Sequence, residues 1–133
     1  MIFSKQVAAH SALYQKRIKA VFGLTAQGVV NLAQLPTAKG GRMRVDTSFL
    51  RNSGGAELGR MPSGPSVQGE AGTTGEPLAA VLAKWLPDQS IFWGWSANYA
   101  RAREFKDGFM RGAAEKWPEI VKRTAALVKA RIQ

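Results

Sequence analysis

The sequence predicts an α+β fold, in which a small antiparallel sheet packs with a long N-terminal and a long C-terminal helix. Three observations lead to this prediction. Apolar residues recur at helical spacing near both ends, one run around residue 93 alternates as a strand does, and a long stretch in the middle is rich in glycine and proline. A chain of 133 residues is long enough to bury a core and short enough to form one domain, residues 1–133.

The first helix is expected over residues 4–35. Ser4 suits an N-cap, Gly23 weakens the interior enough to allow a break there, and Pro36 ends the helix. Residues three and four positions apart form one apolar stripe along this segment: Val7, Tyr14, Ile18, Val21, Thr25, Val29 and Leu32.

The middle of the chain is expected to contain little regular structure. Residues 45–53 indicate a short turn that leads to a strand or a helical turn. Residues 54–77 contain seven glycines and three prolines. Because so many positions lack a large apolar side chain, the segment has too little apolar area to offset the cost of ordering its backbone. The segment is therefore predicted to be a flexible surface loop, a loose hairpin, or an arm that becomes ordered on assembly.

The second half of the chain is predicted to contain two helices and a strand. Residues 77–85 favour a short helix with Pro77 at its first position, although a strand is the alternative. Residues 90–97 alternate as a strand with apolar residues on both faces, so this strand is expected to be buried or covered by a partner. The last helix begins near Arg103 and is kinked or restarted at Pro118.

Positive charge is concentrated at the two ends of the chain. The net charge is +7 over residues 1–44, −2 over residues 45–100 and +5 over residues 101–133. This distribution suggests an acidic partner, either nucleic acid or a complementary subunit face. The alternative is that the terminal helices simply have solvated basic faces.

The sequence contains no recognisable catalytic, cofactor or metal motif. It has no cysteine, and His10 is its only histidine, so neither a disulfide nor a metal site is expected. The absence of a signal-peptide pattern and of a membrane-length apolar run predicts a soluble protein made in the cytoplasm. Four tryptophans are predicted to be core or subunit contacts, with base stacking as the alternative: Trp85, Trp93, Trp95 and Trp117.

Three short motifs resemble a known order of elements. Val45-Asp46-Thr47-Ser48-Phe49-Leu50-Arg51 resembles a Val-Asp-Thr-Gly-x-Leu-Arg turn, with Ser48 where glycine is common. Tyr99-Ala100 with Glu104 follows, and residues 107–121 resemble a final helix. This order is similar to that of the tail-completion or head–tail joining (neck) proteins of long-tailed phages.

The resemblance implies a structural virion protein without catalysis or a cofactor. Such a protein is assembled in the host cytoplasm into a ring, six copies in the expected form, between the head connector and the tail tube. Its partners are further copies, neighbouring neck and tail proteins, and the phage DNA that passes through the lumen. A tail terminator or a head-closure protein is the alternative within this class. A small basic nucleic-acid-binding protein is the rival outside it, and a small hydrolase ranks last.

The candidate residues for assembly come from these motifs and from the strand. Asp46 followed by a threonine can fix a turn, and Arg51 can pair with Asp46 or with an acidic group of a neighbouring subunit. Trp93→Ala is expected to impair ring assembly more than monomer folding. The full set of candidates is Asp46, Thr47, Leu50, Arg51, Trp93, Trp95, Tyr99 and Glu104.

Overall fold

The computed structural model describes residues 2–45 and 48–131, and side chains are described from residue 4 onward. The elements in chain order are α1 (Ile2–Ala33), the 3-10 helix η1 (Thr37–Lys39), α2 (Phe49–Asn52), β1 (Gly54–Leu58), α3 (Leu78–Lys84), β2 (Ile91–Trp95), α4 (Ala100–Asp107), α5 (Phe109–Glu115) and α6 (Trp117–Arg131).

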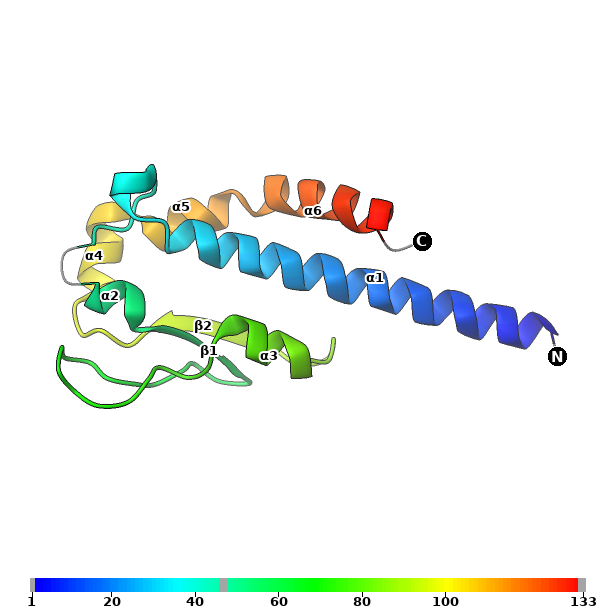
Figure 1. The fold of residues 1–133 in the computed structure, drawn as a ribbon, viewed down its shortest axis with the longest axis horizontal. Coiled ribbons are helices and arrows are strands. Elements are labelled where there is room, and N and C mark those ends of the chain that lie inside the picture. Colours follow the sequence, from blue (N-terminus) through cyan, green and yellow to red (C-terminus); the bar gives the residue numbers. More distant parts are fainter. Residues whose placement is uncertain (1, 46–47, 132–133) are drawn as a thin grey trace.

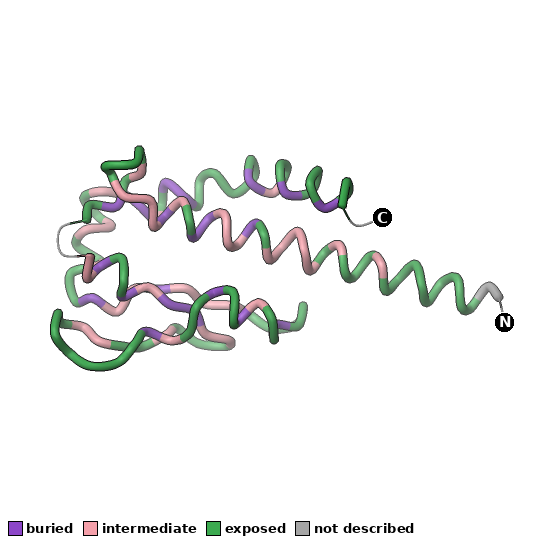
Figure 2. Tube along the Cα trace, viewed as in Figure 1, coloured by how far each residue is buried: buried purple, intermediate pink, exposed green. Residues whose placement is uncertain are grey.

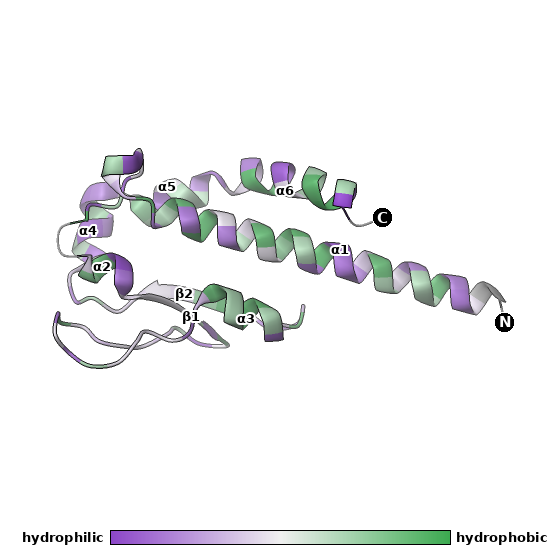
Figure 3. Cartoon of the chain, viewed as in Figure 1, coloured by the Kyte–Doolittle hydropathy of each residue, from purple (hydrophilic) through white to green (hydrophobic). Residues whose placement is uncertain are grey.

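Helix α1 is the axis of the molecule (Figure 1). Helices α5 and α6 pack along one side of its second half, while α3 and the β1–β2 pair lie on the other side. This arrangement confirms the predicted α+β fold, with a long helix at each end of the chain and a small antiparallel sheet. Buried residues lie in the second half of α1 and in the elements that pack against it, where hydrophobic residues are also frequent (Figures 2 and 3).

Helix α1 is continuous through Gly23, and it begins at Ile2. Ser4 therefore lies inside the first turn, so its prediction as the N-cap was wrong. The break that Gly23 allows does not occur, because packing against α3 supports the helix there: Leu82 methyl groups lie beside Gly23. Tertiary contact outweighs the modest helical cost of one glycine.

Strands β1 and β2 form an antiparallel pair in which Ala56 faces Trp93 and Gly55 faces Gly94. The β2 strand confirms the strand predicted at residues 90–97. The prediction that residues 54–77 form one loop was wrong over residues 54–58, which are β1. The reason is a tertiary one: a Cβ at Gly55 would overlap the Thr74 carbonyl, so glycine here lets the returning chain approach the strand.

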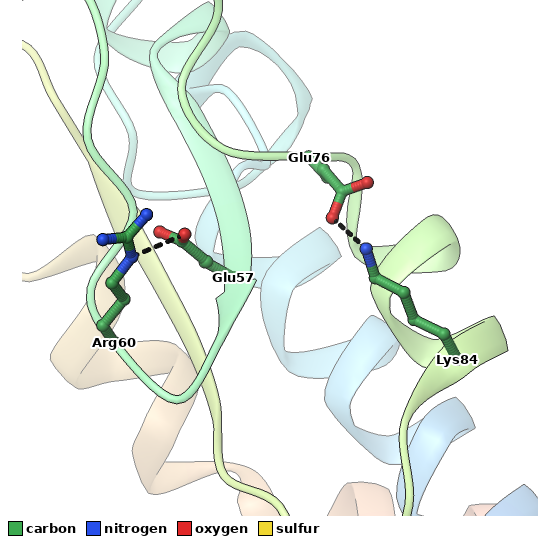
Figure 4. Close-up of polar contacts among 4 residues, drawn as sticks. All are labelled: Glu57, Arg60, Glu76 and Lys84. Carbon is green, nitrogen blue, oxygen red and sulfur yellow. Dashed lines mark hydrogen bonds and ion pairs between the residues drawn. The ribbon is translucent and has the colours of Figure 1, made fainter.

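The rest of that segment, residues 59–77, is attached to the sheet at several points. Ala56 and Glu76 exchange two backbone hydrogen bonds of 2.8 and 2.9 Å, and the Asn98 amide donates to the Ser66 carbonyl at 2.8 Å. Two exposed ion pairs flank the segment, Arg60–Glu57 at 2.7 Å and Lys84–Glu76 at 2.6 Å (Figure 4). Exposed pairs add little stability, so the backbone bonds hold this loop in place.

The C-terminal region is three helices, where the sequence suggested one. The restart predicted at Pro118 is confirmed, because α6 begins at Trp117 and proline is well tolerated in a first turn. The earlier break at Gly108 was not predicted. Gly108 has a φ of 64°, a left-handed conformation that ends α4 and starts α5.

The core consists of three clusters of buried side chains. Trp95 packs against two of them, so β2 connects the α1–α5–α6 layer with the end of the molecule that holds α2 and α4. The clusters are Val29, Ala33, Ala113 and Ile120; Val30, Ala56, Leu78 and Val81; and Met43, Leu50, Ala97 and Phe109.

We expect Gly23→Ala to stabilise the protein by about 0.5–1 kcal/mol, because alanine is the better helix former. The new Cβ would lie 3.8 Å from the Leu82 methyl groups, an ordinary contact. Gly28→Ala is the matched control: its Cβ would lie only 3.0 Å from Ile120 Cγ2, which offsets the gain. Urea unfolding of both variants tests this, and an equal gain for both would contradict it.

Candidate functional site

Three of the predicted residues meet at one end of the molecule. Leu50, Arg51 and Tyr99 line a common pocket of about 460 Å³, although Tyr99 is distant from the other two in the sequence. The remaining lining residues are Arg44, Val45, Ser48, Gln68 and Arg103. The pocket therefore brings together α2, the start of α4 and the 59–77 loop. Asp46 and Thr47, the other candidates from the turn motif, lie outside the described residues.

Ser48 sets the direction of the chain at the edge of the pocket. Its φ is 66°, and among the described residues it is the one non-glycine with a left-handed backbone. This conformation costs an L-residue about 1–2 kcal/mol, which is why glycine suits the position. Position 48 thus has the left-handed backbone that a glycine there would supply, although serine occupies it.

Arg51 is held by the end of α1. Its Nε donates to the Gln34 carbonyl oxygen at 2.9 Å, and the Gln34 side-chain amide donates back to the Arg51 carbonyl at 3.0 Å. Gln34 Oε1 also accepts from Trp95 Nε1 at 2.7 Å. Gln34 therefore connects α1, α2 and β2. The sequence did not predict this role of Gln34, because no local pattern distinguishes a glutamine near a helix end that bonds to two other elements.

The two strand tryptophans pack inside the monomer. Trp93 packs against the cluster of Val30, Ala56, Leu78 and Val81, and the Trp95 ring meets Phe109 edge-on with centroids 4.9 Å apart. Trp93 Nε1 is buried and has no hydrogen-bond partner among the described residues. Leu50 is also buried. Folding alone accounts for these three side chains, and their role in assembly stays a prediction.

Glu104 connects two helices. Its carboxylate accepts from the Met110 amide at 2.8 Å and from the Arg111 amide at 2.9 Å, so it caps α5 from the last turns of α4. The neighbouring Asp107 forms a partly buried ion pair within α4, accepting from two Arg103 nitrogens at 2.7–3.0 Å. Glu104 thus has a structural task in one chain.

Tyr99 is an exposed candidate residue beside the pocket. It precedes the first turn of α4, its side chain is partly exposed, and its ring lies 6.3 Å from that of Phe49 at a tilt of 50°. The two rings form an aromatic edge, of which Tyr99 lines the pocket together with the arginine side chains. Such an edge suits contact with a flat partner group more than it suits proton transfer.

Metal-binding clusters and membrane-spanning helices are both absent from the described residues. No group of three or more His, Asp or Glu side chains among them is placed to hold a metal ion, and no helix that the structure describes is long and apolar enough to cross a membrane. His10 lies exposed on the first half of α1. The chemistry of the site is therefore that of three guanidinium groups around a pocket.

No family model matches the sequence, and no curated protein or solved structure is similar to it. The resemblance to phage neck proteins accordingly rests on the motifs quoted above. It stays a prediction, which the geometry of the chain can help to test.

Proposed function

We propose that the protein is a structural component of a tailed-phage neck, a tail-completion or head–tail joining protein that assembles into a ring without a catalytic step. A tail terminator or head-closure protein would use the same kind of surface. The observation that supports assembly is the first half of α1, which extends beyond the rest of the molecule (Figures 1 and 2).

The free half of α1 carries large apolar side chains that the other described residues leave exposed. Val7, Tyr14 and Ile18 are 51%, 63% and 42% exposed. They belong to the same stripe of α1 as Thr25 and Val29, which are buried in the second half of the helix. Val7 and Tyr14 also line a hollow of about 460 Å³ on this part of the helix. An exposed stripe that continues a buried one favours burial by a second molecule.

The charge of α1 favours one kind of assembly. Residues 4–33 contain four basic residues and no acidic one. A symmetric pair in which two α1 helices met through this stripe would place like charges on adjacent helices about 8–10 Å apart. A head-to-tail contact, in which α1 of one copy meets a different surface of the next, avoids this repulsion. Repeated head-to-tail contacts close into rings when the rotation permits.

Light scattering over a range of protein concentrations tests the proposal. We expect a mass that rises to a discrete multiple of the 14.4 kDa chain, six copies in the proposed form. Tyr14→Glu should raise the concentration needed for assembly at least about tenfold, because it places a charge in the apolar contact.

Ala12→Glu is the matched control, because it adds the same charge to an exposed position of the same helix, outside the stripe. It should assemble like the wild type. If both variants assemble equally well, the stripe is not the contact. If the wild-type chain stays monomeric at every concentration, it does not form a ring by itself.

A further inference from the structure

Arginines from three separate segments line the pocket beside α2. Arg44 follows η1, Arg51 belongs to α2 and Arg103 belongs to α4. No carboxylate is among the described residues that line this pocket. We propose that it binds a phosphate group of a nucleic-acid strand.

Two of the arginines are oriented by their neighbours. The Asp107 carboxylate holds the Arg103 guanidinium from the side with contacts of 2.7–3.0 Å. The Gln34 carbonyl holds Arg51 through Nε at 2.9 Å, and no other side-chain hydrogen bond of Arg51 occurs among the described residues. A guanidinium that is fixed in this way loses little freedom on binding, and its fork matches the oxygens of a phosphate.

Arg44 differs from the other two arginines in having no bonded partner among the described residues. It is exposed, and it has no hydrogen bond or ion pair with any described residue. Arg103 is already paired with Asp107, but Arg44 and Arg51 both line the pocket without a carboxylate partner among the described residues, which is unfavourable without a counter-ion. An anion in the pocket would relieve this repulsion.

The charge around the pocket favours a polyanion over a single acidic side chain. The segments 37–51 and 100–111 carry eight basic and three acidic residues. Glu104 and Asp107 are already engaged in hydrogen bonds, and the third acid, Asp46, lies outside the described residues. Helices α2 and α4 lie at the same end of α1 (Figure 1). Basic residues spread beyond the pocket suit the repeated charge of a phosphate backbone. The basic residues are Lys39, Arg42, Arg44, Arg51, Arg101, Arg103, Lys106 and Arg111.

The aromatic edge of Tyr99 and Phe49 supports the same ligand. Both rings are accessible in part, and Tyr99 lines the pocket itself. Proteins that bind nucleic-acid strands combine basic grooves with aromatic rings on which bases or sugars rest. The pocket is built within one chain, so this proposal does not depend on ring formation.

The test is fluorescence anisotropy of a short labelled DNA duplex, and of its single strand, with the full-length protein. At about 150 mM salt, Arg44→Gln should weaken binding about tenfold and lower the salt slope by about 1, because one charge-assisted contact is lost. Arg123→Gln is the matched control: it removes the same charge from an exposed position of α6, outside the pocket and outside the two basic segments. It should stay within about twofold of the wild type.

Competition with inorganic phosphate distinguishes a pocket that binds a DNA phosphate from one that binds a free oxyanion. At constant ionic strength, replacing chloride by phosphate should displace the DNA from the wild type and should have less effect on Arg44→Gln. Equal losses for Arg44→Gln and Arg123→Gln would overturn the proposal, since they would indicate general attraction to a basic protein. Phosphate binding without DNA binding would assign the pocket to a free oxyanion instead.

Light scattering of the same variants, without DNA, distinguishes this proposal from the ring. If Arg44→Gln binds DNA normally but no longer assembles, the pocket receives an acidic group of another subunit, and the assignment to nucleic acid is wrong. If assembly is unchanged and DNA binding falls, the assignment is supported whether or not the chain forms a ring.

Discussion

Replacing Trp93 by alanine should lower the free energy of unfolding by about 3 kcal/mol, the low end of the usual cost for a core aromatic, because Trp93 is partly buried. Trp93 packs against Val30 of α1, Ala56 of β1 and two residues of α3, so its loss leaves a cavity where three elements meet. The sequence alone suggested a larger effect on assembly than on folding. Denaturant unfolding followed by circular dichroism measures the first effect, and light scattering measures the second.

Phenylalanine substitutions at the two strand tryptophans provide the control for this prediction. Trp93→Phe removes a buried N–H that has no partner among the described residues, whereas Trp95→Phe removes the bond to Gln34. We expect Trp95→Phe to cost at least about 1 kcal/mol more than Trp93→Phe. A Trp93→Ala protein with wild-type stability and lost assembly would instead support the interpretation based on sequence.

Replacing Glu104 by alanine should lower the free energy of unfolding by about 2 kcal/mol, because one carboxylate caps two amides at the start of α5. Glu104→Gln should lose less, since it keeps one acceptor oxygen. Hydrogen exchange at the Met110 and Arg111 amides should be faster in Glu104→Ala, which locates the effect.

Glu115→Ala is the comparison. Glu115 is exposed at the last position of α5, the helix that Glu104 caps, and it makes no ion pair with a described residue. It should change stability by less than about 0.5 kcal/mol. Equal effects at the two positions would show that the contacts of Glu104 with the α5 amides contribute nothing beyond general charge.

Periodicity predicted the elements whose form is decided locally. The stripe from Val7 to Leu32 identified α1, and the alternation around Trp93 identified β2. The boundaries were less accurate, because the N-terminal start and the break at Gly108 depend on backbone conformation rather than on side-chain pattern. A glycine in a helical pattern indicates a possible break, but Gly23 and Gly108 look alike in the sequence and behave differently.

Tertiary contacts account for what the sequence did not predict. Strand β1 begins with two glycines, which are poor strand formers, and it exists because Glu76 and Trp93 lie on either side of Ala56. The pocket depends on a similar meeting of distant residues. The motifs placed Arg51 and Tyr99 among the candidates, but nothing in the sequence placed Arg44 and Arg103 beside them.

The unequal surroundings of the two halves of α1 have a consequence for how a partner would bind. A helix as short as the free half of α1 is only marginally stable in water when it is isolated, because forming its first turn is costly. Here the half that packs against α3, α5 and α6 already provides that turn, and the free half only extends it. A partner that docks on the free half therefore meets a helix that has been nucleated in advance, and association does not include the entropy of starting one.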